Sequence, residues 1–319
     1  MMAKPKAAFY WAASCGGCEI SLLAIHEKIV QVAEAVDIVF WPVAIDVKYK
    51  HVEEMEDDSI DICLYNGAVR TEENEHLAKL LRRKSKILVA HGSCAHTGGI
   101  PGLANFANKE EIFNRVYHEN PSLDNPEKIV PQTETEVPEG KLKLPRFFNT
   151  VKTLAQTVDV DYFMPGCPPA PEQTWNVLSA VLEGKLPPKG SVIGSDELTV
   201  CDQCKHTPQQ KAIKEIKRPH EVILDPDICI LEQGVICMGP ATMAGCGAQC
   251  TEADMPCRGC YGPPAGVIDQ GAKMCSALAS IIDSQDPEEI EKLIDSIVDP
   301  AGLMYRFGLP GSTLRRALK

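Results

Sequence analysis

Residues 86–99 read KILVAHGSCAHTGG, an apolar run that breaks at a glycine and leads directly to a cysteine. The same arrangement occurs twice more, in AAFYWAASCGGC at residues 7–18 and in VDYFMPGCPP at residues 160–169. Each apolar run has the length of a buried strand, and each turn that follows holds glycine or proline. The sequence therefore predicts three strands, each ending next to one or two cysteines.

Segments of helical periodicity separate these strands. We predict helices at residues 19–35, 72–84 and 172–182, and further strands at residues 38–43 and 61–65. Strands that alternate with helices form a mostly parallel sheet with helices on both faces. Residues 1–185 are therefore predicted to form an α/β domain with a flavodoxin-like, doubly wound parallel sheet.

Such sheets bind ligands beyond the carboxyl ends of their strands, at the point where the strand order reverses. Cys15, Cys18, Cys94 and Cys167 all lie just past a predicted strand end. We therefore expect four thiols from three loops to converge on one crevice.

The rest of the chain has a different character. Residues 117–146 hold five prolines and many charges, so we expect an excursion across the surface. The stretch LPPKG at 186–190 reads as a linker, and residues 186–275 carry nine of the fourteen cysteines. We predict that residues 186–319 form an irregular iron–sulfur domain with a short helix at 287–299. Within it, residues 186–275 are expected to be held by metal ligation in place of an ordinary core.

The cysteine spacing indicates metal clusters. Three C-x2-C pairs occur, and iron–sulfur clusters often begin with such a pair and take four thiolates each. Twelve cysteines fall into three sets of four: Cys15, Cys18, Cys94 and Cys167; Cys201, Cys204, Cys229 and Cys237; Cys246, Cys250, Cys257 and Cys260. Structural zinc uses the same spacing, so zinc stays an alternative, although twelve ligands in one chain favour clusters.

The composition limits where the protein works. No run of 18 apolar residues exists, so no membrane span is expected. The formal net charge of −12 argues against a nucleic-acid partner. Residues 7–13 are too short for a signal peptide, and we expect a cytoplasmic protein. In a reducing cytosol, fourteen cysteines indicate metal or redox chemistry, not disulfides.

Three motifs carry a family resemblance. The segments CGGCE at 15–19, GSCAHTGGIPG at 92–102 and PGCPPAPE at 165–172 resemble the small subunit of nickel–iron hydrogenases, and the similarity covers nearly the whole chain. The resemblance implies that the first cysteine set holds the proximal 4Fe–4S cluster. The nickel-binding pattern of the large subunit is missing here, which implies that hydrogen is split on a partner and that this chain moves electrons.

The remaining sets depart from the standard periplasmic pattern. Cys201 stands where the family usually has a histidine ligand of the distal cluster, whose other ligands here would be Cys204, Cys229 and Cys237. Cys250 looks like a fourth ligand of the medial cluster, beside Cys246, Cys257 and Cys260, where a proline leaves a 3Fe–4S cluster in that pattern. The resemblance thus implies three 4Fe–4S clusters, and extra thiolates lower cluster potentials.

Both departures resemble the cytoplasmic hydrogenases of methanogens. The tract MGPATMAGCGAQCTEADMPCRGCYGP at 238–263 is most similar to the deazaflavin-non-reducing, methyl-viologen-reducing class. That class implies three partners: a large subunit with the nickel–iron centre, a small iron–sulfur subunit and heterodisulfide reductase.

Some residues near the first set have two interpretations. Glu19 follows Cys18, and acids are favoured at helix N-termini, but the family analogy suggests a proton relay toward the partner. Gly16, Gly17 and Gly166 permit close approach of backbone amides to a cluster.

Histidines and leftover cysteines are interpreted as supporting residues. His91 and His96 flank Cys94, and we expect packing or hydrogen bonds to sulfur, not ligation. His206 competes with Cys201 as a distal ligand but is not needed. Cys63 and Cys275 are expected to pack in the core.

Two other functions compete with the hydrogenase hypothesis. A quinone-reductase subunit of the complex I type shares the N-terminal fold, but it has adjacent cysteines in its first motif and a single cluster. A zinc-stapled interaction protein would explain the cysteines without redox chemistry.

Overall fold

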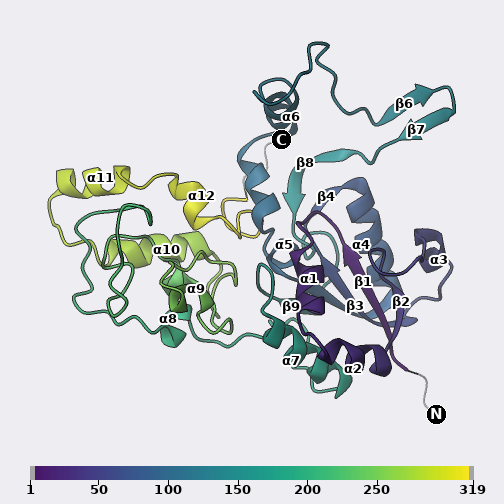
Figure 1. Cartoon of the computed structure of the whole chain (residues 1–319), viewed down its shortest axis with the longest axis horizontal. Helices are drawn as coiled ribbons and strands as arrows, with labels where there is room; N and C mark the ends of the chain where they lie inside the picture. Colours follow the sequence, from purple (N-terminus) through teal and green to yellow (C-terminus); the bar gives the residue numbers. More distant parts are fainter. Residues whose placement is uncertain (1–3, 316–319) are drawn as a thin grey trace.

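The computed structural model describes residues 4–315, and a five-stranded parallel sheet lies at its centre (Figure 1). The strand order is β2-β1-β3-β5-β9, and every neighbouring pair is parallel. The strands are β1 (Lys6–Trp11), β2 (Asp37–Phe40), β3 (Ile60–Asn66), β5 (Ser85–His91) and β9 (Tyr162–Met164). The order reverses at β1, which confirms the predicted flavodoxin-like sheet.

Helices cover both faces of the sheet. α1 (Gly17–Leu23), α2 (Lys28–Ala35) and α7 (Pro171–Leu182) pack on one face, and α3 (Tyr49–Glu53) and α4 (Glu72–Lys84) pack on the other. Side chains alternate between the faces along each strand. Leu64 therefore contacts the core under α1, whereas Cys63 and Tyr65 lie in the core under α4.

The single helix predicted for residues 19–35 is wrong, because the chain forms two helices there. α1 ends at Leu23, α2 begins at Lys28, and His26 between them has a φ of 58°. A residue in the left-handed region cannot continue a right-handed helix. Leu22 and Val32 are nevertheless buried in the same core. Because both helices lie on one face of the sheet, their apolar residues follow one continuous helical period in the sequence.

The predicted surface excursion is confirmed and contains a hairpin that the sequence did not predict. After α5 (Ser93–His96), η1 (Ile100–Phe106) and α6 (Lys109–Tyr117), the antiparallel strands β6 (Glu134–Val137) and β7 (Gly140–Lys143) project from the body (Figure 1). The chain returns through β8 (Phe147–Lys152), which pairs antiparallel with β4 (Val69–Thr71).

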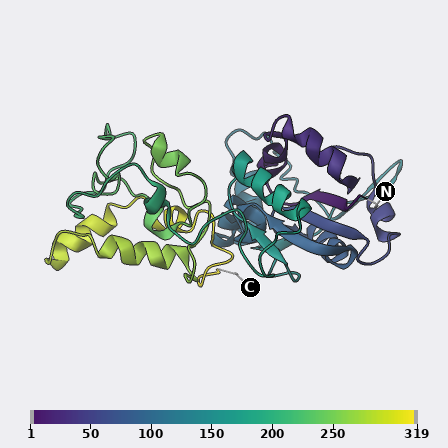
Figure 2. The same cartoon turned by 90° about the horizontal axis from the view of Figure 1, so that it is seen from below.

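The C-terminal part lies beside the sheet as a second lobe (Figure 2). It contains α8 (Val200–Gln203), η2 (Gly239–Ala241), α9 (Gln249–Glu252), α10 (Gln270–Ala279), α11 (Pro287–Asp295) and α12 (Pro300–Met304), joined by long irregular loops. The helix predicted for 287–299 thus ends at Asp295.

The expectation that this lobe lacks an ordinary core is wrong. Met274, Leu278 and Met304, from α10 and α12, pack with Ile230 and Ile236 of the cysteine-rich loops in one buried apolar cluster. The C-terminal helices thus pack their apolar side chains against those of the cysteine-rich loops.

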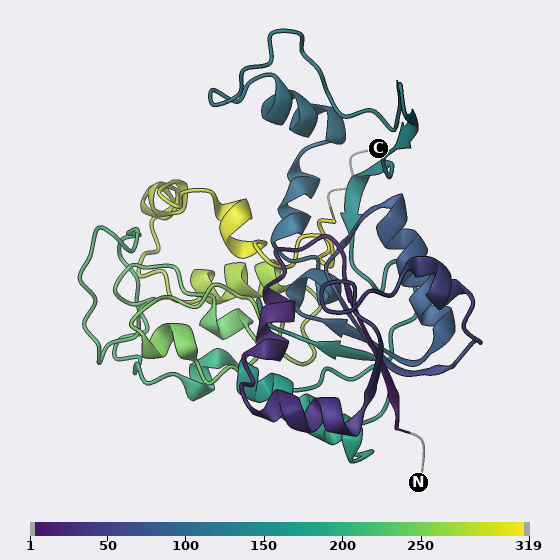
Figure 3. The same ribbon diagram turned by 45° about the vertical axis from the view of Figure 1, so that its right-hand side comes forward.

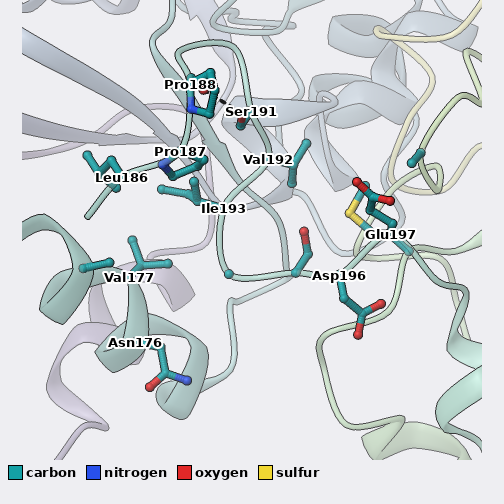
Figure 4. A pocket seen from close by; sticks show the side chains of 15 residues that line it. Asn176, Val177, Leu186, Pro187, Pro188, Ser191, Val192, Ile193, Asp196 and Glu197 are labelled. Atoms are coloured by element: carbon teal, nitrogen blue, oxygen red, sulfur yellow. Dashed lines mark hydrogen bonds between the residues drawn. The ribbon is translucent and has the colours of Figure 1, made fainter. Parts of the chain in front are cut away.

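The two lobes are joined by the residues after α7 and by contacts of the C-terminal segment. Thr97 Oγ1 donates to the Phe307 carbonyl at 2.6 Å, and Gln156 Nε2 donates to the Pro310 carbonyl at 2.7 Å. Figure 3 shows the yellow C-terminal segment running from the second lobe back to the sheet lobe. Figure 4 shows the cavity that the joining segment encloses against α7, and no cysteine lines it. The domain boundary between residues 185 and 186 stays a prediction.

Within the described range, no helix combines the length and the apolar character needed to cross a membrane.

The packing of α4 gives a test of the fold. Leu81 is fully buried against the sheet, so Leu81→Ala should leave a cavity and cost about 2–5 kcal/mol. A lower midpoint of thermal unfolding, measured anaerobically by circular dichroism, is the expected result. Lys79→Ala on the same helix is the control, because 60% of its side chain is exposed. Equal midpoints for the two variants would contradict this packing.

Candidate metal centres

Four cysteines lie together at the carboxyl edge of the sheet. Cys15 and Cys18 follow β1 at the start of α1, Cys94 lies in α5 after β5, and Cys167 follows β9. Parallel strands end at the same edge, and the thiols of Cys94, Cys167 and Cys15 all act electrostatically on Cys18. The structure therefore brings the first predicted set together.

Burial and mutual repulsion disfavour ionisation of these thiols in the metal-free chain. Burial, followed by the charges of the other three thiols, raises the pKa of Cys18. Burial and the neighbouring thiols also raise the pKa of Cys94 to about 12. A cationic iron cluster would offset both penalties, because it binds the thiolate forms. The donor set therefore fits a cluster.

The glycines around this set have different surroundings. The Gly17 N–H donates to Cys15 Sγ at 3.4 Å, whereas a Cβ at Gly16 would meet the Trp11 ring and one at Gly166 would meet the Pro169 backbone. The sequence reasoning missed Gly92, where a Cβ would collide with Cys18 Sγ. Its position between a strand end and Ser93-Cys94 was the available signal.

The second set lines one small cavity in the C-terminal lobe. Cys201, Cys204, Cys229 and Cys237 all face it, together with His206 and apolar residues. Burial, followed by the charges of neighbouring thiols, raises the pKa of Cys201 to about 12. Four thiols around one mostly apolar cavity also fit an iron–sulfur cluster.

The third set comes from α9 and the loops on both sides of it. The charge of Cys246 acts on Cys250, Cys257 and Cys260, so the four thiols share one neighbourhood. Burial is again the main effect, and it raises the pKa of Cys257 to about 12. Cys250, at the second position of α9, is the exposed member.

Hydrogen bonds and thiol charges connect the three sets in order. The charge of the Cys167 thiol, in the first set, acts on the Cys260 thiol of the third. The Cys257 N–H, in the third set, donates to Cys237 Sγ of the second at 3.2 Å. The third set therefore lies between the other two.

Side chains next to the ligands reinforce the first of these connections. The Ser93 hydroxyl donates to the Cys260 carbonyl, and the buried Tyr261 hydroxyl donates to Gln173 Oε1 at 2.5 Å. The Ala170 N–H donates to the same Tyr261 hydroxyl at 3.2 Å. These contacts hold the loop around Cys260 against the loop that follows Cys167.

Glu19 is buried beside the first set. Its carboxylate accepts hydrogen bonds from Trp41 Nε1 and Asn66 Nδ2. Burial raises the pKa of Glu19, and these two bonds oppose the rise. The carboxyl group is therefore fixed in position next to Cys18 and contacts donors that sequence reasoning did not identify.

Of the three histidines near the thiol sets, His91 and His206 are buried and His96 is partly buried. Burial lowers the pKa of His91 and His96 to about 4, so both rings are neutral. His96 packs on Phe163, with ring centroids 5.0 Å apart. His206 lies 2.9 Å from the Thr251 carbonyl through Nε2, so it connects the Cys204 loop to α9.

The two remaining cysteines differ from each other. Cys63 is fully buried in β3, as expected. The expectation of core packing for Cys275 is wrong, because this residue is exposed on α10, with Sγ 3.2 Å from Met304 Sδ.

Among residues 4–315, no three His, Cys, Asp or Glu side chains close on one point as around a single metal ion.

The family described as "NADH ubiquinone oxidoreductase, 20 Kd subunit" matches residues 15–181. The iron–sulfur subunit of an F420-non-reducing hydrogenase from Archaeoglobus profundus is 42% identical and covers 98% of both chains. A subunit of the F420-non-reducing hydrogenase of Methanothermobacter marburgensis is 37% identical over 100% of this chain and 99% of its own.

Solved structures agree with these relatives. An NAD+-reducing [NiFe]-hydrogenase chain, 33% identical, covers 58% of this chain and 94% of its own with a TM-score of 0.50. A [NiFeSe] hydrogenase chain of Desulfovibrio vulgaris Hildenborough, 16% identical, shares the fold over 82% of this chain and 95% of its own, with a TM-score of 0.52.

The full-length relatives are hydrogenase subunits, which favours this assignment over a quinone-reductase subunit of the complex I type. The resemblance of the sequence motifs is thereby confirmed. Together with the parallel sheet and its cysteine-bearing edge, these matches show that the chain belongs to the small subunits of nickel–iron hydrogenases, in the F420-non-reducing class.

Proposed function

We propose that this chain is the electron-transfer subunit of a cytoplasmic nickel–iron hydrogenase and holds three all-cysteine 4Fe–4S clusters. It would pass electrons from the nickel–iron centre of the large subunit to a small iron–sulfur subunit, and on to heterodisulfide reductase. The observation that carries the proposal is the ordered connection of the three thiol sets, through the Ser93 hydroxyl to the Cys260 carbonyl and through the Cys257 N–H to Cys237 Sγ.

The residues of this chain would hold and tune the groups. When bound, an iron–sulfur cluster exchanges single electrons at a potential set by its charge, its hydrogen bonds and its burial. Here the Gly17 N–H donates to Cys15, and the Cys257 N–H donates to Cys237. Such donors stabilise negative charge on sulfur. The negative thiolates of Cys201 and Cys250 would instead lower the potentials of their clusters, which suits a low-potential acceptor.

An apolar surface around Cys15 supports docking of the large subunit there. Cys15 is exposed, and Trp11, Ile20 and Leu23 are 42%, 63% and 53% exposed. Large apolar side chains gathered on one face are typical of a protein interface. The first thiol set would then lie next to the subunit that splits hydrogen.

Glu19 is proposed to move a proton between the partner and this chain. Its carboxylate is buried, lies at the start of α1 near that apolar surface, and is held by Trp41 and Asn66. A fixed carboxyl group within reach of a proton donor is suited to general acid–base work.

Metal analysis of the anaerobically purified complex tests the cluster assignment. Three cubanes predict about twelve irons and twelve sulfides per chain, with nickel in the larger partner chain. Zinc without sulfide would instead support the zinc-stapled alternative and end the proposal.

The assignment of Cys250 has a specific test. Cys250→Ala removes the fourth thiolate of the medial set, so about eleven irons should remain, with an electron paramagnetic resonance signal of a 3Fe–4S cluster. Cys275→Ala is the matched control on an exposed cysteine outside the sets, and it should retain about twelve irons. Identical iron contents in the two variants would remove Cys250 from the ligand set.

The role of Glu19 can be separated from cluster binding. Glu19→Gln keeps the size of the side chain but cannot take up a proton, so hydrogen oxidation should slow by about tenfold or more while iron content stays unchanged. Glu172→Gln, at an exposed carboxylate on α7 (73% exposed), is the control. A wild-type rate in Glu19→Gln would leave Glu19 with a structural role only.

A further inference from the structure

A cavity in the C-terminal lobe gathers cationic side chains from separate segments. Its volume is about 460 Å³, and Lys217, Arg218, Arg258 and Arg306 line it. Lys217 and Arg218 belong to the loop between α8 and η2, Arg258 follows Cys257, and Arg306 follows α12. The tertiary structure alone brings these four residues together.

Among the described residues, the three arginines of the cavity have no ion-pair partner, whereas Lys217 pairs with Glu215. Within residues 4–315, none of the three guanidinium groups forms an ion pair or a hydrogen bond with a carboxylate. Two acids also line the cavity, but Glu221 accepts the Arg218 backbone N–H at 2.7 Å and Asp299 accepts the Gly302 N–H at 2.9 Å.

Electrostatics inside the cavity are correspondingly unfavourable. Burial, followed by the charge of Arg306, lowers the pKa of Arg258, and nearby thiols oppose this shift. Two guanidinium groups in one enclosed space repel each other, and an anion between them would relieve the repulsion.

The surroundings of the cavity favour a protein ligand over a small ion. Residues 205–220 carry five cations against Glu215 alone, and three of them form ion pairs: Lys205 with Asp254, Lys214 with Asp283 and Lys217 with Glu215. Arg218, which lines the cavity, is not among these three pairs. Exposed apolar side chains accompany this charge: Val298 on the cavity wall is 55% exposed, and Ile223 is 98% exposed. The guanidinium groups of the cavity, with these apolar neighbours, complement an acidic protein segment.

The cavity lies beside two thiol sets. The thiols of Cys237, Cys250 and Cys257 all act electrostatically on Arg258. Cys237 belongs to the second set and the other two belong to the third. A protein anchored here would lie beside the second and third thiol sets, away from the sheet edge that carries the first set.

We propose that this cavity anchors an acidic segment of the protein that accepts electrons from this chain, an inference that rests on the electron-transfer function proposed above. The guanidinium groups of Arg218 and Arg306 pair with carboxylates of that segment, and the apolar rim packs against its flanking residues. Attraction between opposite charges also speeds such docking at low salt.

The test uses the anaerobically purified complex and a fluorescent hexaglutamate peptide as the probe. The double variant Arg218→Gln/Arg306→Gln should weaken peptide binding, measured by fluorescence anisotropy, about tenfold. Arg83→Gln/Arg115→Gln removes the same charge from exposed positions of the other lobe and should bind like the wild type.

Three outcomes decide between the hypotheses. Equal peptide affinity in wild type and the cavity variant would overturn the docking proposal. Inorganic pyrophosphate that binds the wild type as tightly as the peptide would also overturn it, in favour of a small-anion site. Hydrogen-dependent reduction of methyl viologen should be unchanged in every variant. Its absence in the wild type would instead contradict the proposed function, independently of the peptide result.

Discussion

Cys18 lies close to the charges of three other thiols in an environment where burial alone already disfavours its ionised form. The same combination of burial and neighbouring thiols raises the pKa of Cys201 and Cys257. In the metal-free chain the thiols avoid this penalty by staying protonated, whereas a bound cation would favour the thiolates. Metal binding at the three places would therefore release protons and add stability to the fold. The irregular, cysteine-rich loops of the C-terminal lobe are arranged around these thiol sets.

The connections between the sets come from residues adjacent to the thiols. Ser93 lies one residue before Cys94 and Tyr261 lies one residue after Cys260, and both hydrogen-bond across the boundary between the lobes. Within the C-terminal lobe, the Cys257 N–H connects the third set to Cys237 of the second set. Because hydrogen bonds of this kind orient ligands and tune a bound metal group, the same contacts would set both the separation and the potentials of the proposed clusters.

The two ends of the row of thiols present different surfaces. Around Cys15 the exposed side chains are apolar, which suits a large and permanent interface. Near Arg258 the surface is positively charged with only scattered apolar side chains, which suits a partner that binds and leaves. A subunit that is fixed to its electron source and exchanges its electron acceptor would need this asymmetry.

The sequence by itself determined the sheet and the strand ends beside which cysteines lie. These features depend on local patterns: an apolar run, a glycine turn and a C-x2-C spacing lie within a dozen residues. The grouping of twelve cysteines into three ligand sets stays a prediction. The break at His26, the apolar core built by α10 and α12, and the exposure of Cys275 were not predictable in that way. The partners of Glu19 and the four cations of the basic cavity also came only from the tertiary structure. Each depends on segments far apart in the chain, and their meeting is decided by packing, which no local pattern records.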